Sequence, residues 1–353
     1  MTVIPWWHPD ILRAKQPFLA DRRRITAATR RFFTAIGFEE VETPTLQVSP
    51  GMEVHLQAFA TELRGPHPDD RAVRYLQTSP EFAMKKLLAG GLPRIFQLAR
   101  AYRNGERSAT HQPEFTMLEW YRAGAGYRDL IDDCIGLVRA AAGVAGRSRF
   151  QFAGHSCDPF ADWEILPVAE AFHRHTGIDV LATAPDPAAP DLDLLAVEGA
   201  RIGIPAHPGD RWEDLFFRIA LERIEPHLGI GRPTVLIDYP LSLAALARPK
   251  PEDPRLAERF ELYCCAVELA NAFGELTDPQ AQRSRFEFDM NLKQQIYGER
   301  FPIDEDFLAA LTFGLPACAG IALGFDRLVM LCAGADTLDQ VLWAPVAGSP
   351  YRG

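Results

Sequence analysis

Two stretches of the chain decide its fold, FQLARAYRNGERSATHQPEFTMLEWY at residues 96–121 and GIALGFDR at residues 320–327. The first predicts two β-strands, because residues 97–103 alternate partly and residues 114–121 alternate between apolar and polar side chains. The loop between them is dense in Arg, Asn, Glu, His and Gln. The second stretch predicts a glycine-flanked apolar strand that leads into an Asp-Arg pair and then into a helix.

An arginine stands at a defined point of each stretch. Arg103 lies at the base of the polar loop, and Arg327 opens the helix after the second strand. A guanidinium group suits phosphate oxygens, because its planar fork matches them bidentately and it keeps its charge. The two side chains could therefore grip a triphosphate from both ends.

The two stretches resemble motifs 2 and 3 of the class II aminoacyl-tRNA synthetases, and HQPEFTMLEWY is similar to the lysyl enzymes of the lysyl, aspartyl and asparaginyl branch. A candidate for motif 1 is an Arg- and Phe-rich helix over residues 19–36, followed by Gly37 and by FEEVETP with Pro44. Shorter matches, TSPE and ELANAFGEL, lie between the motifs. The resemblance implies an α/β (α+β) fold with an antiparallel six- or seven-stranded sheet flanked by helices, and a homodimer formed through motif 1.

The composition is that of an ordinary globular protein, with 353 residues, 47% hydrophobic and 24% charged. One catalytic domain over residues 1–353 is the preferred prediction, although two domains would also fit this length. No run approaches the ~18 apolar residues of a membrane span, and the N-terminus lacks the layout of a signal peptide. The six cysteines show no metal-ligand spacing, which indicates small buried thiols and a cytoplasmic location.

The remaining segments predict helices, one buried strand and one insertion. Residues 144–226 predict a helical and loop insertion within the domain, in which residues 144–165 are irregular. Its Pro-, Gly- and Asp-rich part, residues 182–210, predicts mobile loops. Helices are expected over residues 79–88, 127–142, 167–175 and 212–224, with Ser79 as the N-cap of the first, and a buried strand over residues 234–239.

The net charge and the domain layout of the chain bear on whether it binds tRNA. Asp and Glu exceed Lys and Arg by 47 to 37, for a net charge of −10, whereas a protein that wraps tRNA usually offers a basic face. Lysyl-tRNA synthetases that resemble this chain carry an anticodon-binding barrel before motif 1. Only residues 1–18 precede the motif 1 helix here, and five strands need ~25–30 residues, so no anticodon-binding domain is expected. The arginines of the motif 1 helix are expected to form salt bridges near a dimer interface.

This layout is similar to that of the elongation factor P lysine ligases, free-standing lysyl-tRNA synthetase paralogues that attach (R)-β-lysine to a lysine side chain of elongation factor P. The segments EFTMLEWYR and GIALGFDRLVMLCAGADTL resemble that family along their whole length. The resemblance implies ATP-dependent activation of (R)-β-lysine, elongation factor P as the partner, and no role for tRNA or a membrane. Two alternatives stay open, a truncated lysyl-tRNA synthetase that charges tRNA and a catalytically silent regulatory subunit.

The resemblance also assigns the nucleotide site. Arg103 would contact the α-phosphate and the substrate carboxylate, and Arg327 would hold the γ-phosphate beside the adenine, so these two are the predicted catalytic residues. Positioning and fixed cations can drive this chemistry without a general base. Phe115 would stack on the other adenine face, with a core position as the alternative. The predicted ATP-binding set is Arg103, Asn104, Gly105, Glu106, Gln112, Phe115, Glu268, Leu269, Gly324 and Arg327.

The polar loop departs from the family pattern at two points. Relatives usually read RNE and HNPEF, whereas this chain reads RNGE and HQPEF. Glu106 is expected to replace the missing carboxylate one place along and to hold the adenine amino group. Gln112 still offers an amide, and Gly105 could contact adenine only through backbone atoms.

Three glutamates recur seven residues apart, Glu261, Glu268 and Glu275. The spacing fits a solvated helix face, but the intervening LYCCAVELANAF is too apolar for one and is rich in strand formers. In the lysyl family the first two carboxylates bind Mg²⁺ that bridges the ATP phosphates, and hard cations prefer such oxygen ligands. Glu261 and Glu268 are therefore the predicted metal ligands. Glu275 matches the residue that pairs with the ammonium at the end of the substrate side chain.

A doubly cationic substrate needs paired carboxylates, because a buried ammonium without a partner is very costly. Glu81 is the candidate for one amine, while Glu119 and Tyr121 approach from the motif 2 strand. Asp238 and Tyr239 could line the same cavity, with a structural role at least as well favoured. The predicted amino-acid site comprises Ser79, Pro80, Glu81, Glu119, Tyr121, Glu275 and Ala322.

Ala322 bears on which lysine isomer is used. Lysyl-tRNA synthetases have a glycine-only pattern through motif 3, whereas this chain and the elongation factor P ligases place alanine there. A methyl group in the pocket floor would crowd the α-amino group of lysine and leave room for an amine at the β position. Packing of the strand against a helix is the alternative role for Ala322. Ala272 and Gly274 also depart from relatives and would reshape the pocket wall.

Overall fold

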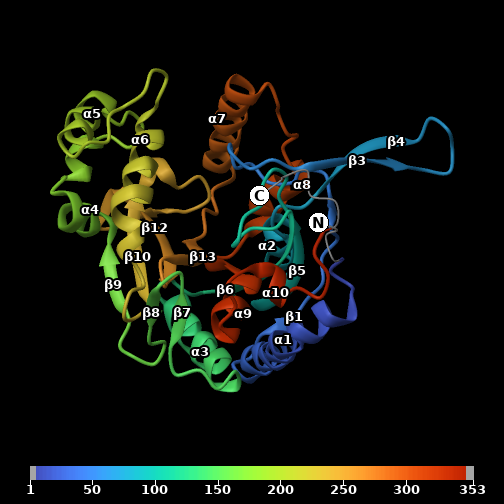
Figure 1. The fold of residues 1–353 in the computed structure, drawn as a ribbon. Helices are drawn as coiled ribbons and strands as arrows, with labels where there is room; N and C mark the ends of the chain where they lie inside the picture. The colour runs from blue at the N-terminus through green and yellow to red at the C-terminus, as the bar shows by residue number, and fades with distance from the viewer. Residues whose placement is uncertain (1–4, 347–353) are drawn as a thin grey trace.

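The computed structural model describes residues 5–346. Its centre is a nine-stranded sheet in the order β1-β5-β6-β14-β13-β12-β10-β9, with β11 paired to β12 (Figure 1). Neighbouring strands are antiparallel except at the two edges, where β1 runs parallel to β5 and β9 runs parallel to β10. The strands are β1 (Glu39–Glu40), β5 (Arg94–Tyr102), β6 (Glu114–Ala123), β9 (Glu164–Pro167), β10 (Thr234–Pro240), β11 (Pro249–Lys250), β12 (Asp253–Cys264), β13 (Val267–Gly274) and β14 (Cys318–Gly324).

Strand β6 shows how alternation divides the molecule into layers. Leu118 and Trp120 are fully buried in the core on one face of the sheet. Trp120 packs on Phe33 with a centroid distance of 5.0 Å, and its indole nitrogen donates to Asp133 at 3.2 Å. The helices of this layer are α1 (Pro9–Ala35), α3 (Asp129–Val144), α9 (Phe325–Ala333) and α10 (Leu338–Val341).

The opposite face of the sheet carries a second core and the main cavity. Tyr121, which points away from the first layer, packs in this second core, together with residues of three helices. Since side chains alternate along a strand, Phe115, Met117 and Glu119 share this face with Tyr121. The three helices are α2 (Glu81–Ala89), α7 (Pro279–Tyr297) and α8 (Glu305–Gly314).

The central insertion packs against the β9–β10 edge of the sheet (Figure 1). Its helices have a hydrophobic cluster of their own, which also contains Leu236, Tyr239 and Tyr263 of the sheet. A π-helical turn, Ala220–Ile224, follows the last helix directly. The helices are α4 (Val168–Thr176), α5 (Leu192–Arg201) and α6 (Trp212–Ile219).

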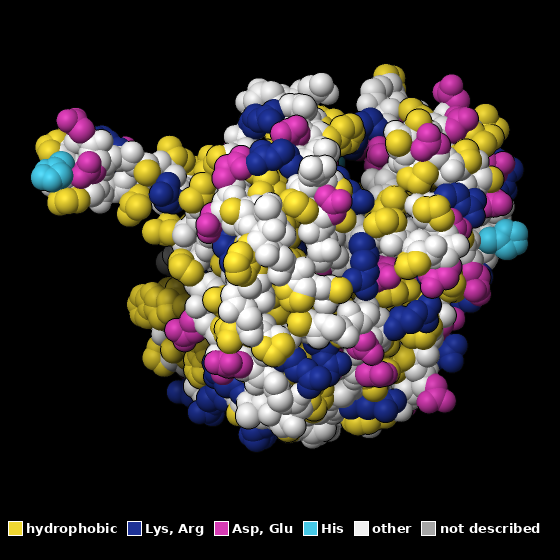
Figure 2. Space-filling view, turned by 180° about the vertical axis from the view of Figure 1, so that it is seen from behind, with side chains coloured by type: hydrophobic (Ala, Val, Ile, Leu, Met, Phe, Trp, Pro, Cys, Tyr) yellow, Lys and Arg dark blue, Asp and Glu magenta, His cyan; other side chains and the backbone are white. Residues whose placement is uncertain are grey.

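Two small sheets complete the fold, and one of them protrudes. Strands β3 and β4 form a hairpin that extends away from the body, at the right in Figure 1 and at the left in Figure 2. The small sheets consist of β2 (Leu46–Gln47), β3 (Phe59–Arg64) and β4 (Arg71–Leu76), and of β7 (Phe150–Phe152) and β8 (His155–Cys157).

Several details of the predicted secondary structure were wrong. The sheet has nine strands rather than six or seven, because short strands at its edges add to the antiparallel centre. Residues 144–165 are not irregular, since they contain β7, β8 and the start of β9, and the stretch 182–210 contains helix α5. The first helix begins ten residues earlier than residue 19, at Pro9. Ser79 is not the N-cap of α2; Pro80 holds that position, although the Ser79 hydroxyl accepts from the Glu81 amide at 3.1 Å.

Other expectations are confirmed. Arginines of α1 form ion pairs within the chain, among them Arg22 with Asp326 at 2.6 Å and Arg30 with Glu40 at 2.9 Å. All six cysteines are buried and free. None of the helices in the described part of the chain combines the length and the apolar character that a membrane span requires.

Candidate active site

A cavity of about 470 Å³ opens on the second face of the sheet, within the ~300–1,000 Å³ range of small-molecule sites. Strands β6, β13 and β14 form its floor, and two loops, residues 53–56 and 243–246, form its walls. Eleven predicted site residues line it: Ser79, Glu81, Arg103, Glu106, Gln112, Phe115, Glu268, Leu269, Ala322, Gly324 and Arg327. The other seven do not line it: Pro80, Asn104, Gly105, Glu119, Tyr121, Glu261 and Glu275.

Both loop walls are fixed by side chains of α7. Lys293, which is fully buried, donates to the carbonyls of Val54 at 3.0 Å and Leu56 at 2.7 Å. Arg285 donates to three carbonyls of the other wall, of which Ala244 and Ala247 lie at 2.7 Å. Hydrogen bonds from charged donors to buried carbonyls are among the stronger ones, so the walls are held in place without a ligand.

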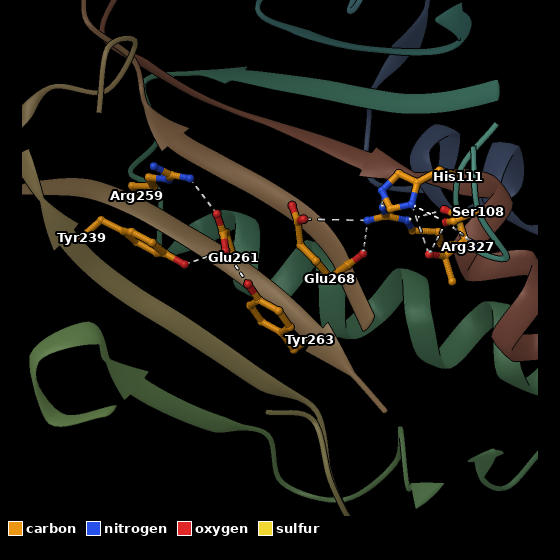
Figure 3. Close-up of polar contacts among 9 residues, drawn as sticks. Ser108, His111, Tyr239, Arg259, Glu261, Tyr263, Glu268 and Arg327 are labelled. Carbon is orange, nitrogen blue, oxygen red and sulfur yellow. Dashed lines mark hydrogen bonds and ion pairs between the residues drawn. The ribbon is translucent and has the colours of Figure 1, made fainter. Parts of the chain in front are cut away.

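Arg327 is held at one end of the cavity by backbone and side-chain acceptors (Figure 3). It donates to the carbonyl oxygens of Glu268 at 2.7 Å and Thr110 at 3.2 Å, and its Nη2 lies 2.7 Å from His111 Nε2. Burial, followed by the charge of Arg327, lowers the pKa of His111. A neutral His111 can accept from Arg327 at Nε2 while its Nδ1–H donates to the Ser108 hydroxyl at 2.8 Å.

Arg103 lies over the ring of Phe115, with its guanidinium carbon 5.3 Å from the ring centroid. Its Nε is buried and has no hydrogen-bond partner among residues 5–346. A buried, unpaired donor is costly, so this nitrogen is available to an anionic group of a ligand. Arg103 and Arg327 both line the cavity, as expected of a pair that contacts one polyphosphate.

The departures in the polar loop have a local explanation. Gly105 has a φ of 82°, which glycine adopts without strain, and the side chain of Glu106 reaches the cavity. Asn104 instead pairs with the backbone of Gln57 at 2.8 Å. The Gln112 amide nitrogen donates to Asp339 at 2.6 Å, which leaves its buried carbonyl oxygen without a donor.

The three heptad glutamates lie on or beside strands, not on a helix. Glu261 is on β12, Glu268 is on β13, and Glu275 directly follows β13. Glu268 lines the cavity, and its carboxylate lies 3.8 Å from Arg327. Burial first, and then the charge of Glu261, raises the pKa of Glu268. This carboxylate suits a hard cation that also binds phosphate oxygens.

Glu261 does not line the cavity and accepts three hydrogen bonds. Its Oε1 accepts from Arg259 at 2.6 Å, and its Oε2 accepts from Tyr239 at 2.6 Å and Tyr263 at 2.7 Å (Figure 3). Within residues 5–346 no group of three or more His, Cys, Asp or Glu side chains is arranged to hold an ion. Glu268 lines the cavity and fits a Mg²⁺ ligand, and Glu261 positions Arg259, which also lines the cavity. Metal binding by Glu261 stays a prediction.

Asp238 and Tyr239 do not line the cavity either. Asp238 has a φ of 61° at a β-bulge in β10 and accepts from Tyr127 at 2.6 Å and from Lys250 at 2.7 Å. The structural alternative therefore holds for both residues.

A buried acidic cluster lies at the other end of the cavity. Glu119 is fully buried and accepts from the hydroxyls of Ser79 at 2.5 Å and Tyr121 at 2.9 Å. Burial, followed by the charge of Glu81, raises the pKa of Glu119 to about 8. Ala322 on β14 is the register partner of Glu119, so its methyl group lies beside this cluster.

Glu275 does not face an open space for a substrate ammonium, because Lys85 is there. The Lys85 ammonium is fully buried, lies 2.5 Å from the Glu275 carboxylate and also binds Glu81. These two carboxylates raise the pKa of Lys85 against the opposing effect of burial. Lys85 thus neutralises part of the negative charge that was expected to bind the ammonium groups of the substrate.

Sequence reasoning missed several residues of the site. Lys85 stands four residues after Glu81, and this ion-pair spacing on a helix could have revealed it. Glu53 and Arg259 line the cavity without any periodic or motif signal, since each comes from a segment that only the fold brings there. His111 opens the HQPEF stretch, but no role was predicted for it.

Comparison with known proteins agrees with this geometry. The family described as tRNA synthetases class II (D, K and N) matches residues 12–347. The chain is 41% identical over 340 residues to "Elongation factor P--(R)-beta-lysine ligase" of Klebsiella pneumoniae (strain 342), which covers 95% of this chain and 96% of the relative. The protein of that name from Salmonella dublin shows the same identity and coverage. The chain therefore belongs to the class II tRNA synthetase family, within its group of elongation factor P–(R)-β-lysine ligases.

Proposed function

We propose that the protein activates (R)-β-lysine with ATP and transfers the β-lysyl group to a lysine side chain of elongation factor P. The observation that carries the proposal is one cavity lined by Arg103 and Arg327 and, at its acidic end, by Glu81, with Glu119 and Glu275 buried beside it. A polyphosphate suits the two arginines, and a cationic amino acid suits the acidic end. The names of the relatives at 41% identity support the same activity.

The residues act by position and charge. In the first step a substrate carboxylate oxygen attacks the α-phosphorus and pyrophosphate leaves; Arg103 would hold both anions together, and Arg327 would hold the leaving phosphates. In the second step the acceptor amine attacks the acyl carbon, AMP leaves, and the amine gives up a proton. Fixed cations that contact the developing charge lower the barrier without a general base. Mg²⁺, bound to Glu268, would supply further positive charge at the phosphates.

The acidic end fits a diamine. Glu81, Glu119 and Glu275 cluster around a single cation, Lys85. The cluster holds three carboxyl groups and one ammonium, so it has acidic groups left to bind the ammonium groups of a diamine. A neutral amino acid would leave these groups without a cation.

We further propose a cytoplasmic homodimer that does not use tRNA. The net charge of −10, and the interspersed acidic and basic side chains on the face in Figure 2, favour a protein acceptor over a nucleic acid. Helix α1 retains exposed arginines, such as Arg23 and Arg31, beside Trp343 for a subunit contact. The presence of Arg103, Glu268 and Arg327 in one cavity argues against a silent regulatory subunit.

The experiment is an acceptor competition. The protein is incubated with ATP, Mg²⁺ and labelled (R)-β-lysine, in the presence of both elongation factor P and tRNA. We expect label on elongation factor P only, with AMP and pyrophosphate formed. Label on tRNA alone would favour the truncated synthetase, and no pyrophosphate exchange with any lysine isomer would favour the silent subunit.

Ala322 offers a test of isomer choice. We expect wild type to prefer (R)-β-lysine over α-lysine, and Ala322→Gly to shift the ratio of kcat/KM values towards α-lysine by roughly 10–200-fold, the effect of ~1–3 kcal/mol in a tight pocket. The measurement is ATP–pyrophosphate exchange with each isomer. An unchanged ratio would assign specificity to other lining residues; Ala272, which was expected to reshape the pocket wall, lies in the core on the opposite face of the sheet, and Gly274 does not line the cavity.

A further inference from the structure

Glu53 is a carboxylate of the cavity lining that has no hydrogen bond or ion pair with another side chain in the described range 5–346. It lies in the loop between β2 and β3, is half-buried, and was not among the predicted site residues. It shares the cavity with Ser79, Glu81 and Arg103.

The Glu53 loop is held in place rather than loosely tethered. Lys293 binds the carbonyls of Val54 and Leu56, on either side of His55. Gly51 makes room for the carboxylate itself, because a Cβ atom there would lie 2.5 Å from Glu53 Oε2. A carboxylate on a fixed backbone loses little freedom when it binds a cation.

The other carboxylates of this end already have partners. Glu119 accepts from Ser79 and Tyr121, and the Lys85 ammonium is shared by Glu275 and one oxygen of Glu81. The carboxylates of the lining that keep oxygens without a side-chain partner are therefore Glu81, with its second oxygen, and Glu53. A substrate ammonium, which has three donors, is matched by such a set.

The position of Glu53 also indicates which substrate amine it would meet. Glu53 lines the cavity together with Arg103 and Glu81, and it borders a small adjoining hollow together with Ser79 and Glu81. Arg103 is the residue that would bind the reacting carboxylate. The amine beside Glu53 is therefore the one nearer to that carboxylate, not the distal one.

We propose that Glu53, together with the free oxygen of Glu81, binds the β-ammonium group of (R)-β-lysine and so helps to set substrate specificity. This role rests on the proposed function. It assigns recognition of one amine to a residue outside the family motifs quoted from the sequence.

The test compares Glu53→Gln with wild type in ATP–pyrophosphate exchange. Losing the charge at one ammonium contact should raise the KM for (R)-β-lysine by roughly 10- to 150-fold, the range for hydrogen bonds to charged groups. The KM for ATP should not change, and Glu53→Asp should recover part of the loss. Glu62→Gln is the matched control, since Glu62 carries the same charge on β3 and does not line the cavity.

A substrate-side control separates amine recognition from a general loss of negative charge. 6-Aminohexanoate keeps the carboxylate and the distal amine but lacks the amine that Glu53 would bind. Its inhibition constant should be the same in wild type and in Glu53→Gln. An unchanged KM for (R)-β-lysine in Glu53→Gln, or an equal loss of affinity for 6-aminohexanoate, would overturn the role of Glu53. Either result would leave the proposed function standing. A wild type that exchanges no lysine isomer would overturn the proposed function, and this inference with it.

Discussion

At the scale of single residues, Lys85 stabilises the acidic end of the cavity in the absence of a substrate. Its ammonium is fully buried between Glu81 and Glu275 and lies over the ring of Phe307, 6.0 Å from the ring centroid. Without this cation, two carboxylates would face each other away from water. Lys85 therefore contributes to the stability of the site as well as to its net charge.

Replacing Lys85 should be costly for folding. We expect Lys85→Met to lower the free energy of unfolding by about 3–5 kcal/mol, because it leaves buried carboxylates without their partner. Urea unfolding at neutral pH measures this. Lys85→Met combined with Glu275→Gln should recover a large part of the loss, since the uncompensated charge is then removed. Equal stability of Lys85→Met and wild type would contradict this role.

At the scale of elements, sequence patterns predicted those strands and helices whose signals are local. Strands β5, β6 and β14 were expected from alternation and flanking glycines, and the structure places them at the centre of the sheet. The early start of α1 was missed because Pro17 lies inside it, and a proline usually marks the boundary of a helix. Strand β1 has only two residues and is recognised by its pairing with a neighbouring strand. So short a strand shows no alternating pattern in the sequence.

The turn between β12 and β13 shows the same limit more sharply. Cys265 and Ala266 both have positive φ, 54° and 57°, in a tight turn where Asn and Gly are the usual signal. Their amides donate to the carbonyls of Gly229 and Leu228, so tertiary contacts stabilise a turn that local preference disfavours. Glu261 and Glu268 lie on the two strands that this turn joins, so their seven-residue spacing is not that of a helix face.

At the scale of the whole molecule, buried carboxylates should make stability fall with rising pH. Burial, as the first cause in each case, raises the pKa of Glu119 to about 8 and those of Glu225 and Asp289 to about 7. The folded state thus keeps protons that the unfolded state has already lost, so raising pH favours unfolding until the folded groups ionise. Histidines with lowered pKa, such as His55 and His111, oppose this trend only below their ordinary value of 6.5.

The predicted window is therefore pH 6.5 to 8. Each group that is protonated only in the folded state contributes a slope of up to about 1.4 kcal/mol per pH unit. Urea midpoints for the ligand-free protein should decrease across this window, and Glu119→Gln should flatten the decrease. A midpoint that rises with pH in both proteins would show that the carboxylates are ionised in the fold.

Helix α7 links the two walls of the cavity mechanically. Lys293 near its end holds the loop of Glu53, and Arg285 about two turns earlier holds the loop of Ala244. A rigid rotation or shift of this single helix would move both walls together. The cavity would then widen or narrow at both walls at the same time. Entry of substrate and exit of product would then share a single hinge instead of depending on two independent loop motions.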